Sequence, residues 1–180
     1  MQKQQQRADG FVVQENAVLD GQALALAQEV FQLVRGGDTD RLRRLLDLGL
    51  PPNMCNDKGD SLLMLASYHG HAGTSALLLE KGADPELRND RGHTPLAGAA
   101  FKGDVRMVEL LLAHGAAVDG RSADGKTPLM FAAMFDRPEV VDALIAAGAD
   151  VTARDDAGLD ARALARAMGA ARTSEQLAAH

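Results

Sequence analysis

The sequence has few of the residues that build β-sheets, and it has no pair of cysteines. Its 180 residues include no tryptophan, one tyrosine and one cysteine, Cys55, and aromatic residues make up 3% of the chain. Sheets are usually rich in aromatic and β-branched residues, whereas the alanine and leucine that dominate this chain suit closely packed helices. A lone cysteine cannot form a disulfide within the chain. We therefore expect an all-α protein.

Long apolar runs are missing too. No stretch approaches the roughly 20 consecutive apolar residues that span a bilayer, since even residues 23–34, ALALAQEVFQLV, are interrupted by Gln and Glu. The first residues lack the apolar run of a secretory signal. The net charge is −6, and acidic and basic residues are interleaved, so no basic stripe could neutralise phosphates. These absences predict a cytoplasmic protein that binds neither membranes nor nucleic acids.

Glycine, by contrast, is frequent and periodic. It recurs every 33 residues in two series, at Gly49, Gly82, Gly115 and Gly148, and at Gly59, Gly92, Gly125 and Gly158. Two series with one period indicate a stacked repeat, in which each unit contacts only its neighbours. We therefore expect function on an extended surface rather than in a pocket.

Each repeat is predicted to fold as helix, turn, helix and turn. The first helix begins after a capping hydroxyl group, which is supplied in three successive units by Ser61, Thr94 and Thr127. It ends where a left-handed residue is needed, at Gly70, Gly103 and, in the third unit, Asp136. A second helix then runs to a glycine of the first series. The polar segment that follows has a glycine at its tip and predicts a β-turn that projects from the helices.

The repeat pattern weakens toward both ends of the chain. Units are expected at about residues 23–55, 56–88, 89–121, 122–154 and 155–180, after a mobile segment at residues 1–22. In the last unit Arg162 and Arg166 replace apolar residues, and a terminal repeat needs such a polar outer face. Thr173 and Gln176 predict a capping box at the start of a last short helix. The domain at residues 23–180 thus has about five units, including degenerate caps.

The second of the well-formed units carries the motif of a known family. Its matching positions are Gly92, Thr94, Pro95, Leu96, Ala99, Ala100, Gly103, Asp104, Leu110, Leu111, Gly115 and Ala116. They form a Gly-x-Thr-Pro-Leu start, an Ala-Ala pair, a Gly-Asp break, a Leu-Leu run and a Gly-Ala end, and this pattern resembles the ankyrin-repeat family. The resemblance covers roughly residues 23–170, and residues 56–72 also resemble small bacterial ankyrin-repeat proteins. It implies an all-α solenoid of helix-turn-helix units with projecting β-turns, and a non-enzymatic protein-protein interaction function.

The chain departs from the family pattern at two kinds of position. Met64, Ala97 and Met130 replace the histidine that follows Thr-Pro-Leu, so we expect the hydrogen bond by which that histidine ties adjacent turns to be absent. Gly98 lies inside a first helix, where glycine costs about 1 kcal/mol relative to alanine. We expect it to mark a close approach of neighbouring helices.

The resemblance places the partner-binding surface on the concave side, which is formed by the turn tips and the exposed positions of the first helices. The helix positions are, by register, Tyr68, His69, Phe101, Lys102, Met134 and Phe135. Because such positions are usually polar, their apolar side chains favour a contact surface, although they could instead pack between neighbouring first helices. The tip positions are Asp57, Lys58, Asp60, Asp90, Arg91, His93, Asp124 and Lys126. Their mixed charges suit a polar rim on a partner protein, but would equally suit solvated turns.

No catalytic, cofactor-binding or metal-binding residues are predicted. His69, His71 and His93 have no cysteine or carboxylate cluster to complete a metal site, and His71 belongs to the family's Gly-His break. Cys55 has no histidine partner at a fixed offset, and the chain has no phosphate-cradling loop. The main interpretation is therefore a monomeric module that binds another protein. Two alternatives remain open: self-association as a homodimer through the apolar positions, and an enzyme with a site among His69, His93 and Cys55.

Overall fold

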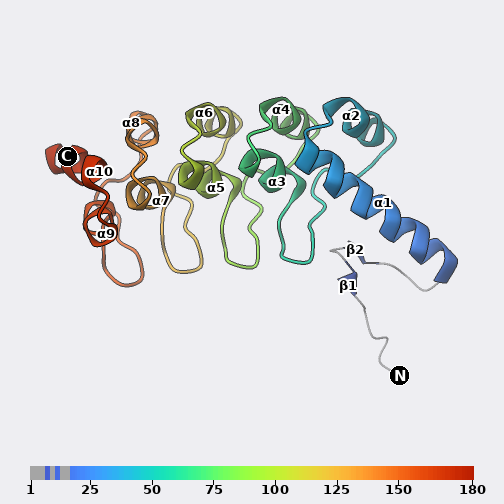
Figure 1. The fold of residues 1–180 in the computed structure, drawn as a ribbon, viewed down its shortest axis with the longest axis horizontal. Coiled ribbons are helices and arrows are strands. Elements are labelled where there is room, and N and C mark those ends of the chain that lie inside the picture. Colours follow the sequence, from blue (N-terminus) through green and yellow to red (C-terminus); the bar gives the residue numbers. More distant parts are fainter. Residues whose placement is uncertain (1–6, 9–10, 13–16) are drawn as a thin grey trace, which may run out of the picture. The chain divides into compact units, whose positions relative to one another are not determined.

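The computed structural model describes residues 7–8, 11–12 and 17–180. The chain divides into two compact units, Met1–Asp84 (unit 1) and Pro85–His180 (unit 2). Its described residues form ten α-helices and one short 3₁₀ helix, together with two short strands near the N-terminus (Figure 1). The all-α repeat fold predicted from the sequence is confirmed, and the two strands are an addition to it. The prediction that residues 1–22 are mobile falls largely on residues 1–6, 9–10 and 13–16, which lie outside the described residues.

Unit 1 holds the first two helix pairs. Strands β1 (Arg7–Ala8) and β2 (Phe11–Val12) pair antiparallel. Helix α1 (Ala17–Gly36) packs on α2 (Thr39–Asp47) and α3 (Leu62–Tyr68), and α2 packs on α4 (Ala72–Glu80). Helix α1 begins at Ala17, before the unit predicted at about residues 23–55, and its N-terminal half occupies the register at which the next unit has a loop and a turn tip. With 20 residues, α1 is much longer than the first helices of the later repeats.

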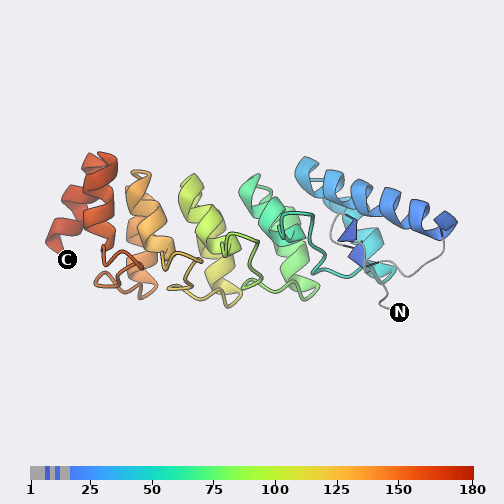
Figure 2. The same ribbon diagram turned by 90° about the horizontal axis from the view of Figure 1, so that it is seen from below.

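Unit 2 holds three helix pairs in two layers. The first helices of the pairs are α5 (Pro95–Lys102), α7 (Pro128–Met134) and α9 (Ala161–Met168), and they lie side by side (Figure 2). The second helices are α6 (Val105–Ala113), α8 (Pro138–Ala146) and α10 (Ala171–Gln176), and the 3₁₀ helix η1 (Leu177–Ala179) follows them. Each second helix packs on its own first helix, and α8 also contacts α6 and α10.

The ends of the first helices agree with the sequence-based prediction. The hydroxyl groups of Ser61, Thr94 and Thr127 each accept a backbone N–H from the first turn, at 3.1, 3.3 and 3.4 Å. At the other end Gly70 and Gly103 have positive φ, and among the described residues Asp136 is the one non-glycine residue that does, at 55°. The sulfur of Met130, which replaces the family's histidine, accepts the Thr127 N–H at 3.4 Å. This position therefore still bonds, although only within its own turn.

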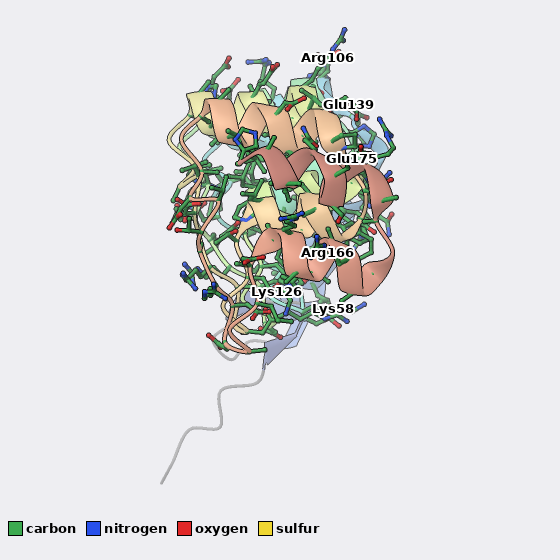
Figure 3. The ribbon with its side chains drawn as sticks, turned by 90° about the vertical axis from the view of Figure 1, so that its left-hand side faces the viewer. Lys58, Arg106, Lys126, Glu139, Arg166 and Glu175 are labelled. Carbon is green, nitrogen blue, oxygen red and sulfur yellow. The ribbon has the colours of Figure 1, made fainter. Side chains whose placement is uncertain are left out.

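Leucines at equivalent positions form the core of both units. In unit 1, Leu63 of α3 and Leu78 of α4 are fully buried. The corresponding leucines of unit 2 are fully buried as well, namely Leu96, Leu111, Leu129 and Leu144. Full burial of one such side chain stabilises the fold by about 1.5–3 kcal/mol. On the outer face of α9, Arg166 is exposed, as the predicted polar cap requires (Figure 3).

Two local predictions are wrong. Thr173 does not cap the last helix but lies inside α10, where its Oγ1 donates to the Ala133 carbonyl of the preceding repeat at 2.7 Å. Gln176 bonds to that repeat too, because its Nε2 donates to Asp142 at 2.6 Å. Gly98 does not mark a close approach, since a Cβ at Gly98 would have no heavy atom of the described residues within 4 Å. Open space lies beside this part of α5 instead.

Candidate functional site

A polar side chain at the base of each turn fixes the shape of the tip. These side chains are 33 residues apart, at Asn56, Asn89, Ser122 and Asp155. In unit 1 the Oδ1 of Asn56 accepts the backbone N–H groups of Lys58 and Asp60, both at 2.9 Å. The three side chains in unit 2 accept backbone N–H groups of their own tips in the same way. The sequence-based reasoning missed these residues, although their spacing was a signal that could have revealed them.

The tip of unit 1 presents one charge of each sign. Asp57 and Lys58 are both exposed, so their charges are accessible to a partner. Asp60 is half-buried, and the Nδ2 of Asn56 donates to its Oδ2 at 3.4 Å. Of the three predicted tip residues in this unit, Asp60 therefore helps to build the turn, while the other two form its surface.

In the first tip of unit 2, too, the residues at the end are exposed and the residue at the base is partly buried. Asp90 and Arg91 are exposed at the end. His93 is half-buried at the base, where its ring contacts the Phe131 ring of α7 edge to face, with centroids 5.1 Å apart. Phe131 was not among the predicted site residues. It lies 33 residues after Gly98, so the preceding unit has no side chain at this register position.

In the second tip of unit 2 the charged side chains pair with other residues of the same chain. The Nζ of Lys126 lies 2.6 Å from an Asp124 oxygen and 3.5 Å from an oxygen of the buried Asp155 (Figure 3 labels Lys126). Hydrogen bonds from Lys126 and then from Ser122 lower the pKa of Asp124 to about 2, and Asp124 in turn raises the pKa of Lys126. The pKa of Asp155 is lowered chiefly by the backbone N–H of Leu159. Asp124 and Lys126 are therefore paired with each other, and the Asp124 side chain stays 58% exposed.

Neighbouring tips of unit 2 are joined through their backbones. The N–H of Ala123 donates to the Arg91 carbonyl at 3.4 Å, and the N–H of Asp156 donates to the Asp124 carbonyl at 3.2 Å. Gly92 and Gly125 make these approaches possible, because a Cβ at either position would lie within 3.0 Å of the facing nitrogen. The three tips of unit 2 therefore form one connected edge.

In unit 1 the predicted helix residues lie at the end of α3. Tyr68 is the last residue of the helix and is 43% exposed, and His69 follows it on the surface. The two rings meet edge to face at 5.8 Å, and the ring of His71 stacks on His69 at 6.1 Å. The Nε2 of His71 lies 2.8 Å from the carbonyl oxygen of Arg35, so His71 ties this turn to the end of α1.

In unit 2 the structure brings two of the predicted aromatic residues together. The rings of Phe101 in α5 and Phe135 after α7 are 4.4 Å apart and inclined by 72°, and both residues are half-buried. Met134, which precedes Phe135 in the sequence, is half-buried, and Lys102, which follows Phe101, is exposed. Phe101 and Phe135 thus pack between neighbouring first helices, as one interpretation of the sequence held, and they also keep part of their surface exposed. Phe101, Lys102, Phe131, Met134 and Phe135 are called the first-helix surface below.

The described residues were compared with what a metal site, a membrane span and a reactive thiol require. Within them no three or more His, Cys, Asp or Glu residues are grouped so as to hold a metal ion. No helix in the same part of the chain is both long and apolar enough to cross a membrane. The Cys55 thiol is half-buried, and its Sγ lies 3.7 Å from the Asn53 carbonyl oxygen.

Comparison with known proteins agrees with this architecture. A family model described as ankyrin repeats (3 copies) matches residues 30–119 and 75–155. A curated protein of Pseudomonas aeruginosa, whose name describes it as an ankyrin repeat protein, is 60% identical over 59 residues. That match spans 33% of this chain and 34% of the relative, about a third of either protein. The family match, by contrast, extends over more than half of the chain, and the chain belongs to the ankyrin-repeat family.

Proposed function

We propose that the protein is a non-enzymatic binding module that holds a partner protein against its first-helix surface. The observation that carries the proposal is the pair formed by Phe101 and Phe135, whose rings contact each other while each residue stays partly exposed. Rings that already pack against each other lose little freedom on binding, and aromatic anchors supply much of the affinity at protein interfaces. Membership of the ankyrin-repeat family supports this function, because its repeats generally serve protein-protein interaction.

Specificity would come from charge and shape at the margins of this surface. Asp90 and Arg91 are exposed on the adjoining tip, and charges at an interface rim orient a partner more than they strengthen binding. The open space at Gly98 would admit a side chain of the partner beside α5. In unit 1, Tyr68 with the tip residues Asp57 and Lys58 offers the same combination of aromatic ring and mixed charge.

The experiment is affinity capture from a lysate of the native organism with matched variants. Gly98→Leu fills the open space with the residue type found at the equivalent positions 65 and 164, and should abolish capture without lowering the melting temperature. Arg106→Ser is the control, because Arg106 lies on α6 at the side of unit 2 away from the tips (Figure 3). Proteins that bind the wild type and Arg106→Ser but not Gly98→Leu would support the proposal.

A second variant tests the aromatic pair itself. Replacing both Phe101 and Phe135 with serine should abolish the same capture, with some loss of stability because the rings pack on each other. Circular dichroism measures that loss separately. If both this variant and Gly98→Leu remain folded and still capture the same proteins, the first-helix surface is not the binding site.

A further inference from the structure

The last repeat of unit 2 has a small polar pocket. The pocket has a volume of about 210 Å³ and lies between the chain before the last tip, the start of α9 and the 3₁₀ helix η1. Arg154, Arg162 and Asp160 form its charged walls, and Val151 and Leu177 add apolar ones. Two positive charges against one negative charge make the pocket cationic, and they suit a singly charged acidic group better than a doubly charged phosphate. The pocket shares no residue with the first-helix surface.

Arg162 replaces a core leucine of the repeat. At its register the preceding units carry Leu96 and Leu129, which are fully buried. Arg162 is half-buried at the pocket, and its Nε atom is buried without a hydrogen-bond partner among the described residues. A buried donor without an acceptor destabilises the fold. A carboxylate would supply that acceptor, because it matches a guanidinium group in both charge and forked geometry.

The preceding repeat shows how side chains at this edge hold a polypeptide segment. Asp119 accepts the backbone N–H of Asp150 at 3.1 Å, and the Nη1 of Arg121 donates to the carbonyl oxygen of Arg154 at 2.7 Å. Asp119 and Arg121 thus hold the two ends of segment 150–154, which belongs to the next repeat. One side chain accepts a backbone N–H of the segment, and the other donates to a backbone carbonyl.

The same two register positions line the pocket in the last repeat. They are occupied by Thr152 and Arg154, 33 residues further along the chain. The Nη1 of Arg154 donates to the Gly158 carbonyl of its own tip at 2.7 Å, as that of Arg121 does to Gly125 at 3.0 Å. Within the part of the chain that the structure describes, the contact of Arg121 with the next repeat has no counterpart at Arg154. Thr152 and Arg154 are therefore placed to hold a further polypeptide segment.

We propose that this pocket binds an acidic peptide segment of a partner protein. Arg154 donates to a backbone carbonyl of the segment, as its counterpart does in the preceding repeat, and the Oγ1 of Thr152 accepts a backbone N–H. Arg162 binds a glutamate or aspartate side chain, whose methylene groups pack on Val151 and Leu177. An uncharged segment would leave the arginine buried without a counter-ion. This binding is separate from that proposed for the first-helix surface and does not depend on it.

Peptide titration of the full chain tests the proposal, followed by NMR at the Thr152 backbone N–H and the Arg162 side-chain N–H. The probes are three capped pentapeptides of alanine with one glutamate at the second, third or fourth place, and their glutamine counterparts. At least one glutamate peptide should bind about tenfold more tightly than its counterpart, because its contact with Arg162 is charge-assisted. Butyrate, a carboxylate without peptide groups, should bind more weakly than that peptide.

Three results of the titration would overturn the proposal. Equal binding of the glutamate and glutamine peptides would remove the acidic preference. Binding of butyrate as tight as that of the best peptide would assign the pocket to free carboxylates. Absence of a saturable shift with every peptide would show that the pocket binds no such segment.

Variants in the full chain assign the contacts to their residues. Arg162→Leu restores the leucine of the preceding repeats, so it should bind both kinds of peptide equally and should not lower the melting temperature. Arg166→Gln, at an exposed position one turn further along α9, is the matched control and should keep the glutamate preference. Arg154→Lys keeps the charge but loses the fork, and should weaken binding of both peptides several-fold.

Each variant also has a result that contradicts the proposal. A glutamate preference that survives in Arg162→Leu would place the acidic side chain elsewhere. A lower melting temperature of Arg162→Leu would show that the arginine supports the fold itself. Unchanged peptide binding in Arg154→Lys would show that Arg154 does not hold the backbone of the segment. Any of these results would overturn the proposal.

Discussion

Thr173 bonds to Asp136 through its backbone. Its N–H donates to an Asp136 oxygen at 3.0 Å, and its Oγ1, which donates its one proton to the Ala133 carbonyl at 2.7 Å, lies 3.3 Å from the same Asp136 oxygen. Asp136 holds the left-handed conformation that glycine holds at this position in other repeats. Aspartate tolerates positive φ better than most residues, but still at some cost. The turn after α7 thus accepts local strain and gains a carboxylate that anchors α10 to the preceding repeat.

The first prediction separates these two effects of Asp136. Asp136→Ala removes the acceptor while keeping a Cβ at positive φ, and should lower the free energy of unfolding by about 2–3 kcal/mol. Asp136→Asn keeps an oxygen at the same place and tolerates the same φ, so it should cost less than about 1 kcal/mol. Urea denaturation measures both values. Equal losses for the two variants would show that the bond to Thr173 contributes little.

A second prediction concerns the connected tips of unit 2. Gly125 and Gly158 have the same φ of 78°, but only at Gly125 would a Cβ meet a neighbour, the Asp156 nitrogen at 2.9 Å. Among the described residues nothing lies within 4 Å of a Cβ at Gly158. Gly158→Ala therefore measures the cost of the conformation alone, about 1–2 kcal/mol. Gly125→Ala should cost at least about 1 kcal/mol more, because the next tip must move. Chemical denaturation of both variants gives the difference, and equal costs would mean that the tips are not packed.

A third prediction follows from the open space at Gly98. Alanine at this position would meet no described atom and would replace glycine inside α5, where φ is negative. Gly98→Ala should therefore raise the free energy of unfolding by about 1 kcal/mol. Gly73 in α4 is a suitable comparison, because a Cβ there would have an ordinary contact with Thr39 at 3.8 Å. A loss of stability in Gly98→Ala would indicate that neighbouring helices come closer at this point than the structure has them.

The repeat register predicted much of this structure because the same local backbone geometry recurs in every repeat. Caps such as Thr94 and breaks such as Gly103 depend on backbone geometry within a few residues, and sequence motifs report that geometry well. Contacts between repeats depend on side chains about 33 to 40 residues apart, and single-sequence motifs do not report them. Thr173 fits the motif of a cap, yet its hydroxyl reaches Ala133.

The candidate site shows the same limit. Register pairs Phe101 with Met134, whereas the ring that contacts Phe101 belongs to Phe135, one residue further on. The residue types predicted the apolar character of this surface, but not which side chains meet. Lys126 was predicted as a surface charge by its position in a turn, yet it pairs with Asp124 and the buried Asp155, because the neighbouring tip places a carboxylate beside it.

The fourth prediction uses the ion pairs of Lys126. A carboxyl group whose pKa is lower in the folded than in the unfolded chain stabilises the fold above the unfolded value, and this contribution is lost as the pH falls through the folded value. For Asp124 these values are 3.8 and about 2, so its contribution should be full above pH 5 and disappear between about pH 4 and 2. It should be less than about 1 kcal/mol, because the side chain is 58% exposed and solvent screens the pair.

Lys126→Met tests the cause of that pH dependence. Since the hydrogen bond from Lys126 is the largest cause of the low pKa of Asp124, the variant should raise that pKa toward 3.8 and flatten the loss of stability between about pH 4 and 2. The pKa of Asp155 should remain low, because its chief cause is the backbone N–H of Leu159. NMR titration of the two carboxyl groups gives both values. A low pKa of Asp124 in the variant would assign its shift to Ser122 instead, and a normal pKa of Asp155 would mean that Lys126, not the turn backbone, keeps this buried carboxylate charged.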